Sequence, residues 1–235
     1  MIEIKDVGYA YKGKEHFAVR DMSFGLEKGL ITCMLGHNGA GKTTILKIIA
    51  GVLRPDSGEI LYDGVKVDKA TYPDYRKEVA YFDKDWCIAN KTIRFNVDFF
   101  RPLYGGFDEK CFDELMKRFR MAGTDDKIVS ELSSGQKVKF AIAFYLAAKP
   151  SYIILDEPLA TLDPVVKTEI VEVLSDETRG RDMGVLISTH LLEEISDVTD
   201  YIVMIEDGKL VLKGDRESVF ESYGATRLSE VFCKR

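Results

Sequence analysis

A chain of 235 residues, of which 46% are hydrophobic, is long enough to bury a core as one domain with a subdomain or as two modest lobes. Its net charge of -6, from 33 basic and 39 acidic residues, argues against a surface that coats nucleic acid, so no nucleic-acid partner is expected. The longest apolar run, residues 140–148, is far shorter than the roughly 18 residues of a membrane span, and the four cysteines contain no C-x-x-C pair.

Two strands are predicted near the amino terminus. Residues 2–7 and 22–27 alternate apolar with polar or charged side chains, which is typical of half-exposed strands, and the two are expected to pair. Tyr11 lies in the polar stretch between them. Its ring is either a packing residue or a platform for a purine base, and the nucleotide site predicted below favours the platform.

A glycine-rich loop with the sequence GHNGAGKT, residues 36–43, follows a predicted strand at 30–35 and opens a predicted helix at 44–50. Glycines let successive backbone N–H groups close on phosphate oxygens where a Cβ would obstruct them. Lys42 adds a positive charge for the β and γ phosphates, and Thr43 offers a hydroxyl to Mg²⁺. The candidate nucleotide-binding residues of this P-loop are Gly36, Asn38, Gly39, Ala40, Gly41, Lys42, Thr43 and Thr44.

Strand signals change twice along the rest of the chain. A turn, a strand and a second turn occupy residues 54–64, and a buried strand is predicted at 79–82. From residue 86 to 148 helical spacing replaces strand patterns, as at Phe112, Leu115, Met116 and Phe119. Because strands return at 152–155, 185–188 and 201–205, the helical block is an insertion in an α/β domain. After Asp215 we expect at most a short capped helix and a tail.

Two carboxylates, Asp156 and Glu157, follow the apolar run at residues 152–155. They are therefore predicted at the carboxyl end of a buried strand, where ligands bind in open α/β sheets. Asp156 suits Mg²⁺, directly or through water, and Glu157 can orient and deprotonate an attacking water. An ordinary acidic turn is the alternative interpretation, and the P-loop weighs against it.

Three other features would pass as structural if each stood alone. The sequence LSSGQ at residues 132–136 looks like a capped helix start, and Asp163 looks like a helix-start residue. His190 closes a strand-like run, where a lone histidine is usually structural.

Together and in this order, the motifs resemble the nucleotide-binding domain of ATP-binding cassette (ABC) transporters over nearly the whole chain. Tyr11 falls where that family places its adenine-stacking aromatic, and His190 matches the switch histidine. The matching segments are residues 36–43 (Walker A), 132–136 (signature), 153–157 (Walker B) and 160–163 (D-loop).

The resemblance implies a P-loop NTPase fold of the α/β class: a three-layer core with an antiparallel β subdomain and an inserted α-helical subdomain. It divides the chain at residues 1–85, 86–148, 149–220 and 221–235, as core with Walker A, helical signature subdomain, core again, and a short tail. It implies an ATPase with ATP and Mg²⁺ as cofactors, in which Lys42, Glu157 and His190 are catalytic and Thr43 and Asp156 hold the metal.

The same resemblance implies partners. Two cassettes, with a homodimer favoured, would meet head to tail, so that each completes the other's ATP site. Ser133 and Gly135 would bind the γ-phosphate of the other copy's ATP, and the further nucleotide-binding residues that the resemblance implies are Ser134, Gln136 and Asp163. A separate transmembrane permease is expected, with the chain in the cytoplasm and peripheral on the inner face of the membrane. The aromatic-rich segment 86–104 either docks that permease or packs within its own subdomain.

Two departures from the family pattern stand out. Ser134 replaces the first of two signature glycines, which is a mild change. Lys84 occupies the position of the family's Q-loop glutamine, and a protonated lysine has no acceptor with which to ligate a cation. We expect slower or differently coupled hydrolysis from that lysine.

Compact single cassettes of this kind resemble bacterial exporters, although importers use the same chemistry. A soluble cassette ATPase, such as one that serves iron-sulfur cluster assembly, is the alternative function. A P-loop GTPase or small-molecule kinase lacks support, because the run NKTI at residues 90–93 has no aspartate where a guanine-reading motif needs one. The cargo is a property of the permease and is not encoded here.

Overall fold

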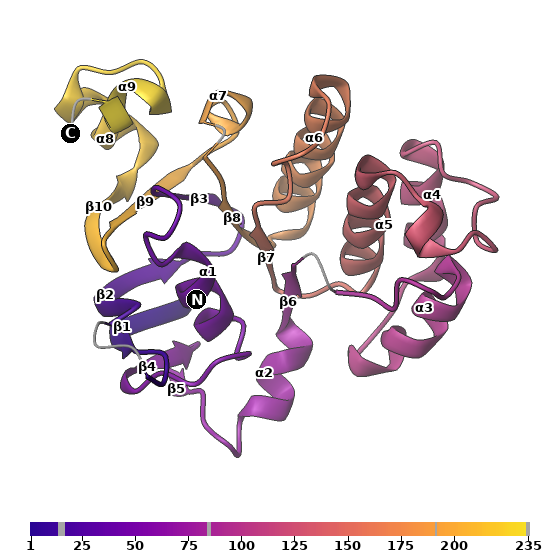
Figure 1. Cartoon of the computed structure of the whole chain (residues 1–235), viewed down its shortest axis with the longest axis horizontal. Coiled ribbons are helices and arrows are strands. Elements are labelled where there is room, and N and C mark those ends of the chain that lie inside the picture. Colours follow the sequence, from indigo (N-terminus) through magenta and orange to yellow (C-terminus); the bar gives the residue numbers. More distant parts are fainter. Residues whose placement is uncertain (14–16, 84–85, 191, 234–235) are drawn as a thin grey trace.

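The computed structural model describes residues 1–13, 17–83, 86–190 and 192–233, and Figure 1 shows their arrangement. An antiparallel sheet contains β1 (Ile2–Tyr9), β2 (Val19–Leu26), β4 (Ser57–Tyr62) and β5 (Val65–Lys66). Its strands lie in the order β2-β1-β4-β5. The predicted pairing of the first two strands is confirmed, with Ile2 opposite Leu26.

A six-stranded sheet runs through the centre of the molecule. Its strands are β3 (Ile31–Leu35), β6 (Val79–Phe82), β7 (Tyr152–Asp156), β8 (Gly184–Ser188), β9 (Tyr201–Glu206) and β10 (Lys209–Asp215). They lie in the order β10-β9-β3-β8-β7-β6, and β10 alone among them pairs antiparallel to its neighbour. Every residue of β3 and β8 is buried, as in parallel sheets covered on both faces. The sequence predicted each strand except β10, whose partly exposed side chains do not alternate.

Helices cover both faces of this sheet. On one face α1 (Lys42–Ile49) packs between the two sheets, and Ile154 of β7 shares a core with Ile45 of α1. On the other face lie α5 (Ser134–Ala147) and α6 (Pro164–Arg181), and Ile153 and Leu155 share the second core with Ile170 of α6. Side chains of β7 therefore alternate between two cores, which makes a three-layer α/β fold, as predicted.

The segment between β6 and β7 is helical in its described residues, where the only strand-like pairing is a bridge between Thr92 and Ile128. The predicted helical spacing is confirmed, because Phe112 and Leu115 face the core from α4 (Glu109–Arg118). Figure 1 shows α3 (Ile93–Phe100), α4 and α5 as an arm beside the sheet. The helices before and within it are α2 (Tyr72–Glu78), α3 (Ile93–Phe100), η1 (Arg101–Leu103), α4 (Glu109–Arg118) and η2 (Val129–Glu131). None of the helices in the described part of the chain could cross a membrane.

The carboxyl-terminal part differs from the single short helix and tail that we predicted. A first helix, α8 (Arg216–Tyr223), is capped by the Asp215 side chain, which accepts a hydrogen bond of 2.9 Å from the Ser218 N–H. A second, α9 (Leu228–Cys233), buries its apolar side against the core and near α7 (Leu192–Ile195). Six residues are too few to reveal helical periodicity in a sequence, so α9 went unpredicted. The expected boundary between residues 220 and 221 falls inside α8.

Candidate functional site

The P-loop turns tightly between β3 and α1 because its glycines accept positions that other residues cannot. Gly41 has a φ of 105°, and a Cβ there would lie 2.6 Å from the Ala18 carbonyl oxygen. A Cβ on Gly36 would lie 2.5 Å from the Ile205 carbonyl oxygen. The loop therefore ends at the amino terminus of α1, whose unpaired N–H groups and dipole favour an anion.

Lys42, the first residue of α1, turns its side chain back over the loop. Its Nζ donates to the carbonyl oxygens of Gly36, at 2.7 Å, and His37, at 3.2 Å. The same nitrogen lies 3.4 Å from Glu157 Oε1, although only 6% of the Lys42 side chain is exposed. The loop thus holds the Lys42 ammonium in place, and the ammonium also faces the Glu157 carboxylate at the end of β7.

Asp156 and Glu157 lie at the carboxyl end of β7, as predicted. Ser188, at the end of the neighbouring β8, donates from its Oγ to Asp156 Oδ1 at 2.8 Å and accepts from the Glu157 N–H at 3.0 Å. Glu157 has a φ of 49°, a left-handed conformation that residues with a Cβ rarely adopt and that concentrates at functional sites. One serine hydroxyl therefore fixes both acidic residues.

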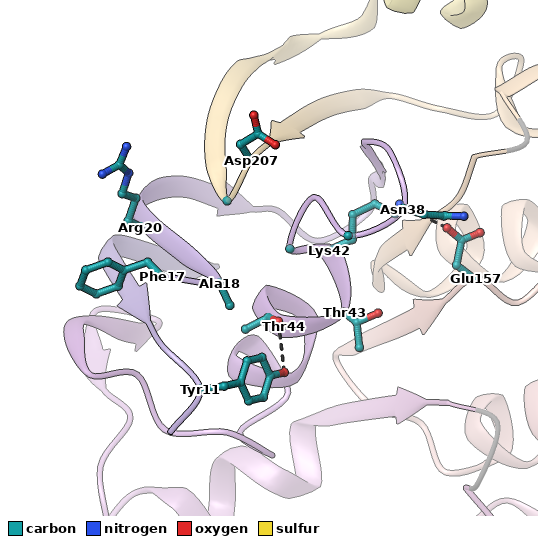
Figure 2. A pocket seen from close by; sticks show the side chains of 13 residues that line it. Tyr11, Phe17, Ala18, Arg20, Asn38, Lys42, Thr43, Thr44, Glu157 and Asp207 are labelled. Atoms are coloured by element: carbon teal, nitrogen blue, oxygen red, sulfur yellow. Dashed lines mark hydrogen bonds and ion pairs between the residues drawn. The ribbon is translucent and has the colours of Figure 1, made fainter. Parts of the chain in front are cut away.

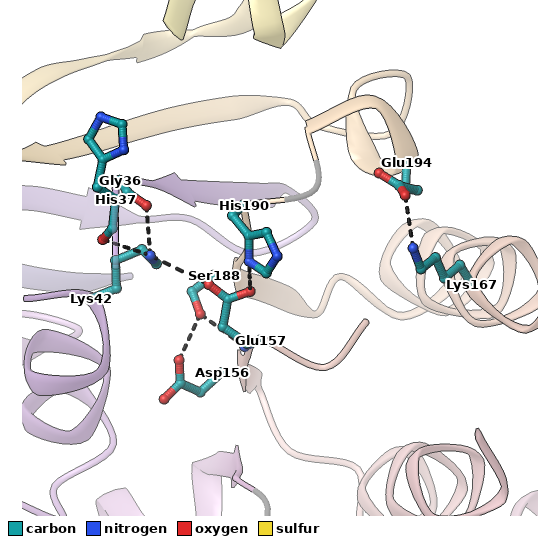
Figure 3. Close-up of polar contacts among 9 residues, drawn as sticks. All are labelled: Gly36, His37, Lys42, Asp156, Glu157, Lys167, Ser188, His190 and Glu194. Atoms are coloured by element: carbon teal, nitrogen blue, oxygen red, sulfur yellow. Dashed lines mark hydrogen bonds and ion pairs between the residues drawn. The ribbon is translucent and has the colours of Figure 1, made fainter. Parts of the chain in front are cut away.

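Glu157 is the centre of a polar cluster that Figure 3 shows in full. His190 Nδ1 lies 2.9 Å from Glu157 Oε2, and because an ionised carboxylate can only accept, Nδ1 is the donor of this contact. The other oxygen, Oε1, is buried and makes no hydrogen bond, with the Lys42 ammonium as its ion-pair partner. The two oxygens of this carboxylate therefore face different groups, the His190 ring and the Lys42 ammonium.

The P-loop opens into a cavity of about 1110 Å³. In Figure 2, Glu157 lies on one side of the view and Phe17 and Arg20 lie on the opposite side, with Tyr11 below Thr44 between them. Tyr11 is 38% exposed, and its hydroxyl lies 3.2 Å from Thr44 Oγ1, so the ring combines a free face with a fixed edge. The described lining residues are Tyr11, Phe17, Ala18, Arg20, Asn38, Gly39, Gly41, Lys42, Thr43, Thr44, Glu157, Asp207 and Gly208.

The signature residues lie elsewhere, and none of them is among the described residues that line this cavity. Ser133 caps α5 in a capping box: its Oγ accepts from the Gln136 N–H at 3.2 Å, and Gln136 Oε1 accepts from the Ser133 N–H at 3.0 Å. Ser134 is exposed, and a Cβ on Gly135 would lie 3.2 Å from Val166 Cγ1 of α6. The capped helix start foreseen as an alternative is confirmed.

Asp163 and Ala40 are the remaining predicted site residues. Asp163 is exposed and caps α6, because its Oδ1 accepts from the Val166 N–H at 3.1 Å. Ala40 is buried in the P-loop, and its carbonyl accepts from Gly208 N–H at 3.0 Å. Lys84, at the Q-loop position, is not among the described residues.

Sequence reasoning missed several residues of the site. Phe17, Arg20 and Asp207 line the cavity, and Ser188 fixes the carboxylates. Asp207 lies in the turn between β9 and β10, far from the P-loop in sequence, and no local pattern marks it. Ser188 ends an apolar run like many strand-final serines, so only the pairing of β7 with β8 reveals its partners.

The chain matches the family model described as "ABC transporter" over residues 19–160. It is 35% identical to "ABC transporter ATP-binding protein YtrB" of Bacillus subtilis, with 95% of this chain and 75% of that one aligned. It is 34% identical to "Energy-coupling factor transporter ATP-binding protein EcfA" of Methanocaldococcus jannaschii, over 100% of this chain and 86% of that one.

A solved structure shares the fold as well. The dimeric structure of MJ0796, described as a bacterial ABC transporter cassette, superposes with a TM-score of 0.82 and 25% identity, covering 92% of this chain and 99% of that one. The family match, the identity over most of the chain and the P-loop geometry agree. This chain therefore belongs to the ATP-binding subunits of ABC transporters, which are ATPases.

Proposed function

We propose that two copies of this chain close on two Mg·ATP molecules and drive a separate permease, with hydrolysis centred on Glu157. The observation that carries the proposal is the buried Glu157 Oε1, which makes no hydrogen bond and lies 3.4 Å from Lys42 Nζ. In this role Glu157 accepts the proton of the attacking water, and the His190 contact at 2.9 Å keeps its other oxygen oriented.

The P-loop residues 36–44 and Tyr11 are proposed to bind the nucleotide. The N–H groups at the start of α1 and the Lys42 ammonium offset phosphate charge, and the exposed Tyr11 ring stacks on the base. Thr43 and Asp156 fit Mg²⁺, because a hydroxyl and a carboxylate are the hard oxygen ligands it prefers. No group of three or more His, Cys, Asp or Glu among the described residues could hold a metal alone, which suits an ion shared with phosphates. When bound, Mg²⁺ would neutralise charge on the phosphates.

Ser133, Ser134, Gly135, Gln136 and Asp163 are proposed to act on the nucleotide of the second copy. In support, Ser134 and Asp163 are exposed, and the start of α5 offers its dipole to an anion. Closing the dimer would add these donors where charge develops, so an isolated copy would be a poor catalyst. The division of the chain into a core, a helical signature subdomain at residues 86–148 and a carboxyl-terminal segment is also proposed, because the family resemblance implies it.

The outer face of α3 and η1 is proposed as the permease-docking face, which would hold the chain peripherally on the inner side of the membrane. Phe95 and Phe99 stack with ring centroids 5.9 Å apart and are 40% and 56% exposed, and Leu103 is 62% exposed. Trp86 and Tyr104 from the same segment instead pack against the core. Exposed apolar side chains gathered in this way are typical of a protein-interaction surface.

Export is proposed as the direction of transport, on the likeness of the compact single cassette to exporters. Reconstitution of the chain with its neighbouring permease in vesicles of known orientation would test it. ATP-dependent movement of cargo away from the cassette side supports export, movement towards that side indicates uptake, and ATPase activity unaffected by any permease supports the soluble alternative.

The central proposal is tested with Glu157→Gln. The amide keeps the shape but cannot accept the proton, so hydrolysis should fall by at least about a hundredfold, while ATP and Mg²⁺ should still produce a dimer on size-exclusion chromatography with light scattering. Glu172→Gln, an exposed residue of α6, is the matched control and should behave as wild type. A Glu157→Gln protein with normal hydrolysis would show that the water is activated elsewhere.

A further inference from the structure

One buried hydroxyl near the carboxylates has no role in the site described so far. Tyr81, on β6, has its side-chain oxygen buried without a hydrogen-bond partner. An unpaired buried polar group costs free energy, and such groups in a native structure call for a reason. A group of the site that shares its face of the sheet would supply that reason.

The pairing of β6 with β7 shows which carboxylate shares a face of the sheet with Tyr81. Tyr81 pairs with Ile154 across the parallel β6 and β7. Side chains alternate along a strand, so Asp156, two residues after Ile154, projects from the same face of the sheet as Tyr81. Tyr81 also packs against the core that contains Ile154 and the helix α1, which is the face on which the P-loop opens.

Electrostatics agree with this placement. Burial raises the pKa of Tyr81, and the nearby charges of Asp156 and then Asp83 raise it further, as does hydrogen bonding of the neutral phenol to Asp156. Among the described residues, the Tyr81 hydroxyl has no hydrogen-bond partner.

Both partners are held for such a contact. The Tyr145 hydroxyl, from the buried helix α5, donates to the Tyr81 carbonyl oxygen at 2.7 Å and fixes the end of β6. Asp156 Oδ1 accepts from Ser188 Oγ at 2.8 Å.

We propose that Tyr81 is a positioning residue for the Mg²⁺ site, whose hydroxyl donates a hydrogen bond to the Asp156 carboxylate when Mg·ATP is bound. With Ser188 it would hold the carboxylate from two hydroxyl groups and fix the direction in which Asp156 presents its oxygens. Outer partners of metal-binding carboxylates orient them in this way, and their removal typically weakens metal affinity about 10- to 100-fold. The inference rests on the proposed Mg·ATP site and adds to it a residue that does not touch the metal.

The test uses Mn²⁺ as a paramagnetic substitute for Mg²⁺ and the full chain carrying Glu157→Gln, so that ATP is retained. Mn²⁺ affinity in the presence of ATP is measured by electron paramagnetic resonance, and ATP affinity in EDTA is measured separately by calorimetry. In the Tyr81→Phe variant of this protein, Mn²⁺ affinity should fall about tenfold or more, while ATP affinity in EDTA should stay within about twofold of its reference.

Tyr75→Phe is the matched control. Tyr75 is a buried tyrosine of the same core, and its hydroxyl donates to the Ile49 carbonyl oxygen. The Tyr75→Phe change therefore removes a buried phenol hydroxyl whose partner is not Asp156. This variant should bind Mn²⁺ as the reference does. Thermal unfolding of both variants verifies that they fold.

Two results would overturn the inference: unchanged Mn²⁺ affinity in Tyr81→Phe, or an equal loss of ATP affinity in EDTA, which would assign the hydroxyl to the nucleotide pocket. Asp156→Asn separates this failure from that of the proposed site. If Asp156→Asn loses Mn²⁺ while Tyr81→Phe does not, the metal site stands and Tyr81 has no part in it. If the reference protein binds no Mn²⁺ with ATP, both proposals fail.

Discussion

The two parts of the chain that carry nucleotide motifs are built in opposite ways. At the P-loop edge, functional groups bond to one another: Lys42 contacts Glu157, and Glu157 contacts His190. At the signature edge, Ser133 and Gln136 bond to each other within the start of α5. The P-loop edge, residues 36–44 with Glu157 and His190, is held by contacts between separate elements of the fold. The signature edge, residues 132–136, is held by contacts within the start of α5, where Ser133 and Ser134 are exposed.

This difference has a physical consequence for catalysis. The P-loop edge holds a buried lysine, 6% exposed, among carbonyls and a carboxylate, an arrangement that phosphate oxygens would complete. At the signature edge, the capping box already satisfies the N–H groups of Ser133 and Gln136, so these two donors need no ligand. Loss of a P-loop group should therefore abolish binding, while loss of a signature group should leave binding intact and affect hydrolysis.

The largest expected effect follows from removing the Lys42 charge. Lys42→Ala should weaken ATP binding by roughly a hundredfold or more, because it deletes the ammonium and leaves Glu157 Oε1 buried without its ion-pair partner. Calorimetric titration with Mg·ATP measures the loss. Lys47→Ala, a change in the last turn of the same helix, is the control and should bind ATP normally. Retained affinity in Lys42→Ala would remove the contrast between the two edges.

Mixing two inactive variants tests whether the signature edge works on the second copy. Ser133→Asp keeps a good helix cap but brings a negative charge to the position proposed to face the γ-phosphate, so it should bind ATP and fail to hydrolyse it. In a mixture with Lys42→Ala, each heterodimer has one intact composite site. Random pairing should then restore about a quarter of wild-type ATPase activity if the sites act independently. No recovery in a mixture that forms heterodimers would place the signature edge outside the partner's site.

A smaller loss is expected for the residue that orients Glu157. His190→Ala removes the 2.9 Å contact to Glu157 Oε2 but leaves the base itself, so hydrolysis should fall by roughly 10- to 100-fold, less than in Glu157→Gln. Mg·ATP affinity should change little, and His190→Gln, which restores a donor, should recover part of the rate. A rate loss equal to that of Glu157→Gln would mean that histidine does more than orient the carboxylate.

The same contrast explains what the sequence could predict. The P-loop and the pair Asp156-Glu157 were predictable, because each is a short pattern attached to a buried strand. Ser188 and Tyr81 were not, since their partners come from pairing between strands distant in sequence. For Ser133 both interpretations were available, and the helix cap is confirmed while its action on the second copy stays a prediction.

The base-binding end should give an intermediate effect on affinity. Tyr11→Ala should weaken ATP binding by about 1–3 kcal/mol if the ring stacks on the base. Tyr11→Phe keeps the ring and deletes only the 3.2 Å contact with Thr44, so it should bind nearly as wild type does. Fluorescence titration with a labelled ATP compares the two. Equal losses would assign the affinity to the hydroxyl instead of the stacked face.

The smallest effect is expected where the unpredicted helix α9 meets the P-loop. Phe232 lies edge-on to His37, with ring centroids 4.8 Å apart, and both line a cavity of about 180 Å³ with His190. Such a ring pair contributes about 0.5–1.5 kcal/mol, so Phe232→Ala should weaken ATP binding by roughly two- to tenfold through a looser P-loop. Phe220→Ala, a partly buried phenylalanine of α8, should lower the unfolding temperature without that change. If Phe232→Ala and Phe220→Ala lose ATP affinity equally, α9 contributes to the overall stability of the fold and not to the P-loop. The contacts that shape the nucleotide site would then extend no further than His190.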